Sequence, residues 1–241
     1  AMRRDFVANV SHEIRTPLTV LSGFVETLQS IPLPEAERQR YLDLMAVQAS
    51  RMQSLVADLL TLSQLEGSLP PGMSEKVALQ ELMSQVASEA QALSAVLSGH
   101  EGDQKTCAHH LVLESVPAWV LLGVRSELYS AISNLVSNAV RYTPAGGTIR
   151  VAWSRDAEQV ILSVRDTGPG IAPEHLPRLS ERFYRVDRSR SRETGGTGLG
   201  LAITKHVAQR HGGELRIESQ VGQGSNFMLV LPTSRLVLQA D

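Results

Sequence analysis

The chain has 241 residues, of which 42% are hydrophobic and 20% are charged, and its formal net charge is −2. This balance is typical of globular domains, excludes a disordered chain, and gives no reason to expect a nucleic-acid partner because no basic excess is present. The single cysteine, Cys107, excludes an intramolecular disulfide framework, fits a reducing cytoplasm, and is interpreted as an ordinary loop residue.

Two long helical patterns are predicted at the start of the chain. In the first, apolar residues recur at steps of three and four from Phe6 to Leu28, and in the second they step 4-3-4-3 from Met45 to Leu59. The short proline-containing segment 30–34 separates the two patterns and predicts an antiparallel helical hairpin. A lone hairpin leaves much of its apolar stripe in water, so we predict that two copies pair as a homodimer into a four-helix bundle.

Residues 67–74 (GSLPPGMS) are rich in Gly, Pro and Ser, which is typical of an interdomain linker. Beyond them, helical patterns alternate with strand-like runs, which predicts a mixed sheet covered on one face by helices. The helices are expected at about 80–98, 125–142 and 198–211, and the clearest strands at 111–113, 148–153, 160–165, 214–218 and 226–231. We therefore predict a multidomain α+β chain with a helical domain (1–66), the linker (67–74), an α/β sandwich domain (75–235) and a tail (236–241).

The first predicted helix contains a histidine, His12, whose neighbours suggest a catalytic role. His12 lies two residues from both Val10 and Ile14, so its helical phase places it opposite the apolar stripe, facing solvent. Taken alone, it would be interpreted as an ordinary surface histidine. Glu13, however, can accept the imidazole Nδ1 proton and so leave Nε2 free to attack phosphorus.

Two more residues of this segment fit the same interpretation. Pro17 lies in the helix interior and is expected to kink the helix, and Thr16 lies one turn after His12 on the same face. Residues 11–18 (SHEIRTPL) resemble the H box of the sensor histidine kinases of two-component systems. The longer string RRDFVANVSHEIRTPLTVL resembles the phosphate-regulon members of that family. The resemblance implies that His12 is the phosphoacceptor, that Glu13 is its base, and that Thr16 supports dephosphorylation of a partner response regulator.

Polar residues of the second domain form a candidate nucleotide site. Asn134 and Asn138 are four residues apart on one helical face, where amide oxygens suit Mg²⁺, and Arg141 can meet phosphate oxygens. Asp166 follows an apolar strand and can accept a hydrogen bond from an exocyclic amine such as that of adenine. Each feature alone has an ordinary alternative, a polar helix face or a strand-end turn.

Glycines complete the candidate site. Gly168 and Gly170 allow a tight turn after the strand. A glycine-rich loop, residues 195–201 (GGTGLGL), then precedes a helix, and its backbone amides and the helix N-terminus would cradle phosphates. The loop is neither a Walker A loop nor a dinucleotide fingerprint. Between the two glycine segments, the weakly periodic stretch 171–197 is interpreted as a lid, and its residues 181–185 (ERFYR) interleave aromatic and charged side chains.

In order and spacing, four segments resemble the N, G1, F and G2 boxes of the histidine-kinase ATP-binding domain, whose fold is shared with gyrase, Hsp90 and MutL. The segments are residues 134–142, 166–171, 181–185 and 195–201, respectively. The resemblance implies that Asn138 is the Mg²⁺ ligand, with Asn134 as the second candidate. It implies that Arg141 contacts phosphate, Tyr142 the adenine side of the nucleotide, and Asp166 the adenine amine. The remaining implied ATP-binding residues are Gly168, Gly170, Gly196, Thr197, Gly198, Leu199 and Gly200.

Three positions depart from the commonest pattern of the family. Ser180 stands where Phe is frequent, Asn226 stands where Thr is usual near the adenine-binding Asp, and Arg141 replaces the more frequent Lys. None removes a group that the chemistry requires. The other histidines fit no standard zinc spacing, so no metal beyond Mg²⁺ is expected. The lid arginines are interpreted as a solvated basic run, with phosphate steering as the alternative; they are Arg182, Arg185, Arg188, Arg190 and Arg192.

The sequence therefore predicts ATP-dependent phosphorylation of His12 and phosphotransfer to a response-regulator aspartate, with a second, phosphatase activity, in phosphate-starvation signalling. The alternatives are a nucleotide-binding dimeric scaffold and an ATPase clamp of the gyrase–Hsp90 class, neither of which phosphorylates a histidine. No apolar run reaches the ~20 residues of a membrane span. We expect a cytoplasmic fragment of a longer protein that an upstream segment holds in the bacterial inner membrane.

Overall fold

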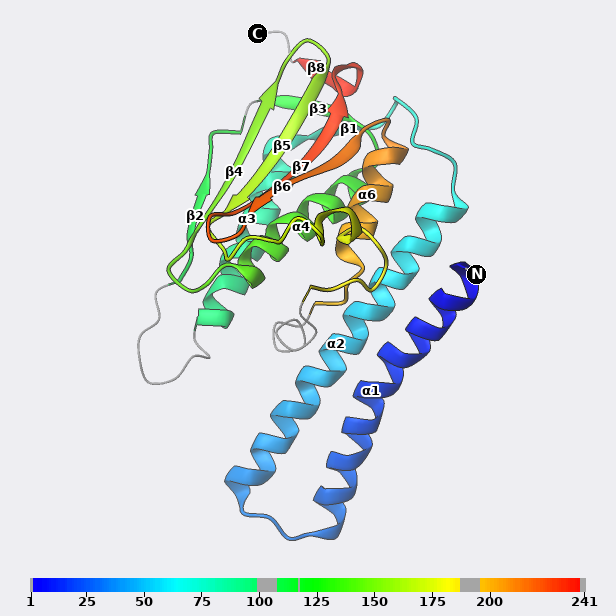
Figure 1. Cartoon of the computed structure of the whole chain (residues 1–241), viewed down its shortest axis with the longest axis vertical. Helices are drawn as coiled ribbons and strands as arrows, with labels where there is room; N and C mark the ends of the chain where they lie inside the picture. The colour runs from blue at the N-terminus through cyan, green and yellow to red at the C-terminus, as the bar shows by residue number, and fades with distance from the viewer. Residues whose placement is uncertain (1, 99–107, 117, 187–195, 239–241) are drawn as a thin grey trace.

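The computed structural model describes residues 2–98, 108–116, 118–186 and 196–238 (Figure 1). Cys107, His100 and the lid residues Arg188, Arg190 and Arg192 lie outside the described residues, so their interpretation stays a prediction. Within the described part of the chain, no helix is both long enough and apolar enough to cross a membrane.

The predicted helical hairpin is confirmed. Helices α1 (Met2–Ser30) and α2 (Glu35–Gly67) run antiparallel and are joined by a short turn (Figure 1). Pro17 is buried inside α1, and the helix continues through it as one element. The turn ends at Pro34, and acidic residues follow in the first turn of α2, where the positive end of the helix dipole stabilises them.

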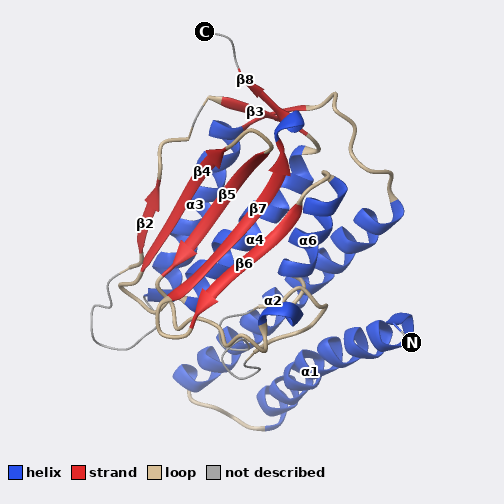
Figure 2. Cartoon of the chain, turned by 45° about the horizontal axis from the view of Figure 1, so that its top comes forward, coloured by secondary structure: helices blue, strands red, loops and turns tan. Residues whose placement is uncertain are grey.

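The second domain contains the predicted mixed sheet with helices on one face. Five strands lie in the order β2-β4-β5-β7-β6, and only the β2–β4 pair among them is parallel. The strands are β2 (His110–Leu113), β4 (Thr148–Arg155), β5 (Gln159–Asp166), β6 (Glu214–Gln220) and β7 (Gly224–Pro232). Helices α3 (Leu79–Ser98), α4 (Arg125–Tyr142) and α6 (Gly200–Arg210) cover one face of this sheet (Figure 2).

A second, smaller sheet corrects the predicted tail. Strands β1 (Lys76–Ala78), β3 (Trp119–Leu122) and β8 (Leu236–Leu238) pair in the order β1-β3-β8. Residues 236–238, predicted to be part of a tail, therefore belong to the fold, because they pair antiparallel with β3. A strand of three residues is too short to show an alternating pattern, and its pairing depends on a partner distant in the sequence.

The core lies between the large sheet and its helices, and it also reaches the hairpin. Ile149 and Leu162 on the sheet and Leu135 on α4 are fully buried. On α2, Leu62 and Leu65 are buried in the same apolar cluster, where α2 packs against α6. Burying one such side chain stabilises the fold by about 1.5–3 kcal/mol, so this end of the hairpin is docked on the second domain.

Two arginines fasten the linker to the second domain. The guanidinium of Arg210 donates to the carbonyl oxygens of Leu65, Ser68 and Leu69 at 2.8–2.9 Å, and Glu127 binds its other edge. Arg235 donates likewise to the carbonyls of residues 71 and 72. The segment that composition predicts as a free linker is therefore held by hydrogen bonds along most of its length.

Candidate functional site

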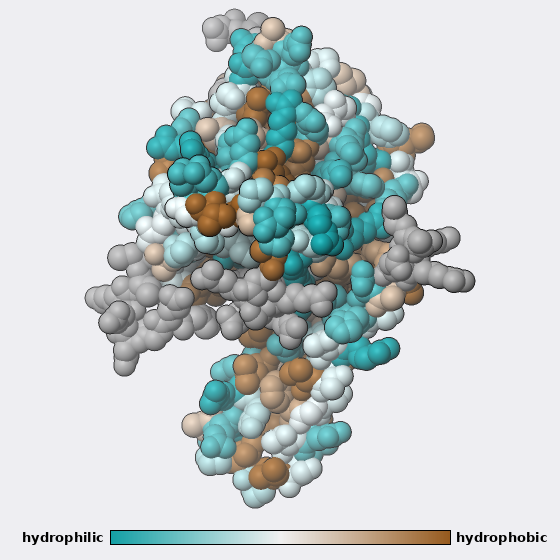
Figure 3. Space-filling view, in the orientation of Figure 1, coloured by the Kyte–Doolittle hydropathy of each residue, from teal (hydrophilic) through white to brown (hydrophobic). Residues whose placement is uncertain are grey.

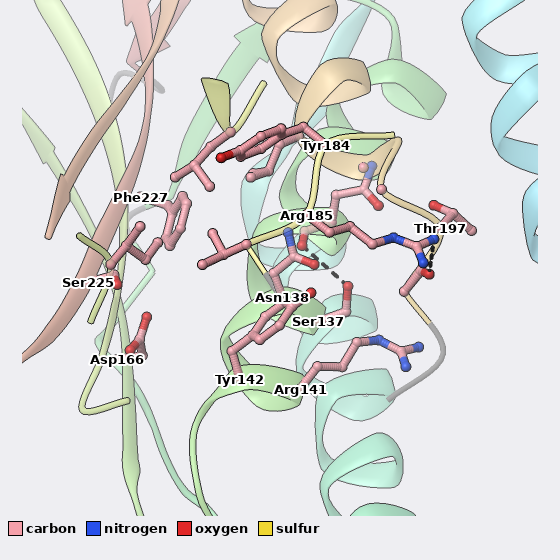
Figure 4. A pocket seen from close by; sticks show the side chains of 18 of the residues that line it. Ser137, Asn138, Arg141, Tyr142, Asp166, Tyr184, Arg185, Thr197, Ser225 and Phe227 are labelled. Carbon is pink, nitrogen blue, oxygen red and sulfur yellow. Dashed lines mark hydrogen bonds between the residues drawn. The ribbon is translucent and has the colours of Figure 1, made fainter. Parts of the chain in front are cut away.

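A cavity of about 380 Å³ lies between α4, the lid, the glycine loop and the ends of β5 and β7, which is within the usual size of small-molecule sites (Figure 4). Figure 4 shows Asp166 and Ser225 at one end, Thr197 at the other, and Asn138 and Tyr142 between them. The predicted site residues that line it are Asn134, Asn138, Arg141, Tyr142, Asp166, Gly170, Gly196, Thr197, Gly198 and Gly200.

Asp166 forms the buried end of the cavity. It is the last residue of β5, its exposed fraction is 6%, and its Oδ1 accepts the N–H of Gly168 at 2.8 Å. Burial raises the pKa of this carboxyl, while the bonds from the Gly168 and Ser225 backbones oppose the rise. Gly168 does not line the cavity; its N–H holds the Asp166 carboxylate. A Cβ at Gly168 would lie 2.8 Å from Asp166 Oδ1.

Helix α4 supplies the polar wall. Asn134, Asn138 and Arg141 recur at helical spacing and all face the cavity, because the opposite face of α4 packs in the core. Tyr142 ends the helix and lies beside them (Figure 4). Burial lowers the pKa of the Arg141 guanidinium from its high ordinary value. This wall combines amide oxygens with a cation, the groups that a metal–phosphate ligand would need.

The glycine loop and the lid close the other end. Gly198 has a φ of +75°, and its carbonyl accepts the N–H of Phe183 at 2.8 Å, which ties the loop to the lid. Arg185 also donates to the Gly196 carbonyl at 2.7 Å. A Cβ at Gly200 would lie 3.0 Å from Asn134 Oδ1, so a larger residue at the helix start would require the Asn134 amide to shift. Leu199 lies within this loop but is fully buried in the core and does not line the cavity.

In the structure, Asn226 lies on the face of β7 that points away from the cavity. Successive residues of a strand point to opposite faces, and the residue paired with Asp166 in β7 is Ser225. Ser225 is buried and lines the cavity, whereas the Asn226 side chain accepts a hydrogen bond from Ser163 at 2.6 Å on the other face. The expectation that Asn226 stands near the adenine-binding carboxylate was wrong, because the residue that pairs with Asp166 is Ser225, one position earlier in β7.

The His12 segment lies outside the cavity. His12 is exposed on α1, as its phase predicts, and Thr16 Oγ1 donates to the His12 carbonyl at 3.2 Å. Glu13 Oε2 lies 3.2 Å from Arg51 Nη2 of α2 and 3.5 Å from Arg185 Nη2 of the lid. The carboxylate beside the histidine is therefore paired with two guanidinium groups, one from each domain.

Sequence reasoning missed the contribution of α2 to the cavity. Ser54 and Asp58, four residues apart on one helical face, line it together with α4 and the glycine loop. Phe227 of β7 and Tyr184 of the lid also line it. Only the lid residues carried a local signal, the interleaved aromatics of 181–185; nothing near Asp58 in the sequence indicates which domain it faces.

Comparison with known proteins agrees with this arrangement. Two family models match in series: the His Kinase A (phospho-acceptor) domain over residues 2–68, and the histidine kinase-, DNA gyrase B- and HSP90-like ATPase over residues 123–235. The chain belongs to the sensor histidine kinases. The phosphate regulon sensor protein PhoR of Pseudomonas aeruginosa is 51% identical over 227 residues, which are 94% of this chain and 49% of that protein. This sensor kinase chain thus spans about half the length of that curated relative.

Solved structures share the fold. Full-length ShkA in complex with AMPPNP is 28% identical and matches with a TM-score of 0.62 over 98% of this chain and 47% of that one. Histidine kinase ThkA in complex with the response regulator protein TrrA is 22% identical, with a TM-score of 0.69 over 95% of this chain and 61% of that one. The helical hairpin followed by an ATPase-type sandwich is therefore the architecture of this sensor kinase region.

Proposed function

We propose that this sensor kinase region transfers the γ-phosphoryl group of ATP to Nε2 of His12 and passes it to an aspartate of a response regulator. One observation carries the proposal: a single chain places an exposed histidine on an H-box helix and builds a cavity with a buried carboxylate at one end and a glycine loop at the other. The AMPPNP bound in the relative ShkA supports ATP as the ligand.

ATP would lie along the cavity in one direction. The Asp166 carboxylate would accept a hydrogen bond from the adenine amine, because it is buried and aimed into the cavity. Tyr142 would contact the adenine side, and the phosphates would extend toward Arg141 and Thr197 at the other end. Loop amides and the N-terminus of α6 favour an anion there.

The residues present fit a Mg²⁺ ion. Asn138 would hold it, with Asn134 as the second candidate, because both amides line the cavity on one face of α4 and hard cations prefer oxygen ligands. When bound, the ion would neutralise charge on the phosphates during transfer.

The chain's own residues supply the remaining chemistry. The Nε2 lone pair of His12 forms the new N–P bond, the bond from phosphorus to the β,γ-bridging oxygen breaks, and ADP leaves with that electron pair. Glu13 takes the Nδ1 proton. Glu13 is paired with Arg51 and Arg185 in this structure, and a swing of the second domain would separate it from Arg185.

Transfer also requires the two domains to move. His12 does not line the cavity, so the domains, with boundaries at 1–66 and 75–235, must swing about residues 67–74 to align it with the γ-phosphate. The bonds from Arg210 and Arg235 to the linker carbonyls must rearrange during that swing.

The proposal extends to partners. Apolar side chains such as Leu18, Val25 and Leu42 stay exposed along the hairpin, and a second copy would cover them in a four-helix bundle (Figure 3). The regulator-bound structure of ThkA supports a receiver domain as the other partner, and Thr16 would support the phosphatase reaction. Likeness to PhoR supports phosphate-starvation signalling by a longer protein of the inner membrane, with this region in the cytoplasm.

The test is incubation with γ-labelled ATP with and without Mg²⁺. We expect Mg²⁺-dependent label that is stable in alkali and labile in acid, and a chelator should prevent its appearance, since phosphohistidine needs the metal-bound nucleotide. Phosphate release without label on the protein would favour the ATPase clamp, and nucleotide binding without either product would favour the scaffold.

Asp166→Asn should weaken nucleotide binding by about 10- to 100-fold, the effect of losing one hydrogen bond to a charged group. The amide keeps an oxygen for the Gly168 N–H but presents its NH₂ group to the adenine amine. Calorimetric titration with a non-hydrolysable ATP analogue measures the change. Asp156→Asn removes the same charge in the exposed turn between β4 and β5, and equal affinities of the two variants would contradict the assignment.

A further inference from the structure

An acidic residue of the phosphotransfer hairpin reaches into the nucleotide cavity. Asp58 of α2 lines the cavity on the side of Arg141 and Thr197, although the rest of the cavity wall comes almost entirely from the second domain. Thr197 Oγ1 donates to Asp58 Oδ2 at 2.5 Å, and the Arg141 charge stabilises the Asp58 carboxylate. Asp58 is therefore bonded to Thr197 and stabilised by the charge of Arg141, the two groups to which the proposed function assigns the phosphates of ATP.

The contact also reaches the start of α6. The Thr197 oxygen that donates its proton to Asp58 accepts the N–H of Leu199 at 3.2 Å. Removal of Asp58 from water raises the pKa of its carboxyl, while Thr197 and Arg141 oppose the rise. The geometry places a negative side chain at the phosphate end of the cavity, held by donors that would otherwise serve the nucleotide.

Other acidic residues of the hairpin meet the lid in the same way. Glu66 of α2 forms an ion pair with Arg182, and Glu13 of α1 lies 3.5 Å from Arg185. Phe6 of α1 packs on Phe183 with ring centroids 6.0 Å apart. The hairpin is thus docked on the lid through an apolar contact and carboxylate–guanidinium pairs. Asp58 is a third acidic residue of the hairpin on this side, and it lies in the cavity wall.

We propose that Asp58 is an internal competitor for the phosphates of ATP, so that nucleotide binding and the docked hairpin exclude each other. The proposal rests on the proposed function, because it uses Thr197 and Arg141 as phosphate contacts. A carboxylate and a polyphosphate at the same donors repel each other strongly where water is scarce. Binding of ATP therefore expels Asp58 and helps to free the hairpin, and by reciprocity the docked hairpin lowers the affinity for ATP.

Asp58→Asn tests this competition. The amide keeps an oxygen for Thr197 but removes the charge, so the affinity for a Mg²⁺-bound, non-hydrolysable ATP analogue should rise about five- to tenfold in calorimetry. Asp43→Asn is the matched control, because Asp43 is exposed on the same helix, remote from the cavity, and its replacement makes the same change in net charge. Adenosine, which has no phosphates, should bind equally to both variants and to the wild type.

A second variant acts outside the cavity. Glu66→Gln removes the docking contact with Arg182 and should also tighten binding of the analogue, because it weakens the docked state that opposes the nucleotide. Equal affinity of Asp58→Asn and Asp43→Asn, or weaker binding by Asp58→Asn, would overturn the competition while leaving the proposed function intact. Failure of the wild type to bind the analogue at all would instead overturn the proposed function.

Discussion

His12→Ala is expected to abolish the acid-labile label that wild-type protein acquires from γ-labelled ATP. The substitution removes the attacking Nε2. It should leave the fold and the nucleotide cavity unchanged, because His12 is exposed on α1 and does not line that cavity. Affinity for the ATP analogue should therefore stay at the wild-type value. The two measurements together separate loss of the phosphoacceptor from loss of the nucleotide site.

His110→Ala is the matched control for this experiment. His110 is also exposed, but it lies on the edge strand β2, far in sequence from the hairpin. It should keep the full label. If label of the same chemical stability persisted on His12→Ala, another residue would be the phosphoacceptor, and the assignment of the H-box histidine would be wrong.

Gly170→Ala is expected to lower the free energy of unfolding by about 2–5 kcal/mol. Gly170 has a φ of +70°, and a Cβ there would lie 2.0 Å from the Gln220 carbonyl oxygen, a backbone atom that cannot move aside alone. The Gly222 N–H bond to the Pro169 carbonyl, 2.7 Å long, holds the two loops at this distance. Urea denaturation followed by circular dichroism measures the change.

Gly146→Ala separates the two causes. Gly146 has a similar φ of +77° but has no atom within 4 Å of the position that a Cβ would take. This control should lose only about 1–2 kcal/mol, the cost of a left-handed conformation. Equal losses for the two variants would show that backbone conformation alone, and not the close approach of the loops, explains the requirement for glycine at Gly170.

Ten of the residues that line the cavity could be predicted from local chemistry. The polar face of α4, the carboxylate at the end of β5 and the glycine loop are each contained in a short segment, and their order along the chain follows the family pattern. The hairpin and the large sheet were predictable for a related reason, since apolar periodicity reports directly which face of an element is buried. The phase of His12 on α1 is one outcome of that periodicity.

Small errors arose where that periodicity was weak. Strand β8 has three residues and needs β3 as a partner, so 236–238 resembled a tail. In β7, a shift of one residue exchanges the two faces of the strand, and only its pairing with β5 places Ser225, and not Asn226, beside Asp166.

The family, the order of the two domains and His12 as the candidate phosphoacceptor could be predicted from the sequence, because each depends on residues close together in the chain. The contacts between the two domains could be found only from the tertiary structure. It pairs Glu13 with Arg185, fastens the linker to Arg210, and joins Asp58 to Thr197 across 139 positions of sequence. Such contacts depend on how two folded domains pack against each other. Local apolar patterns and short motifs do not predict that packing.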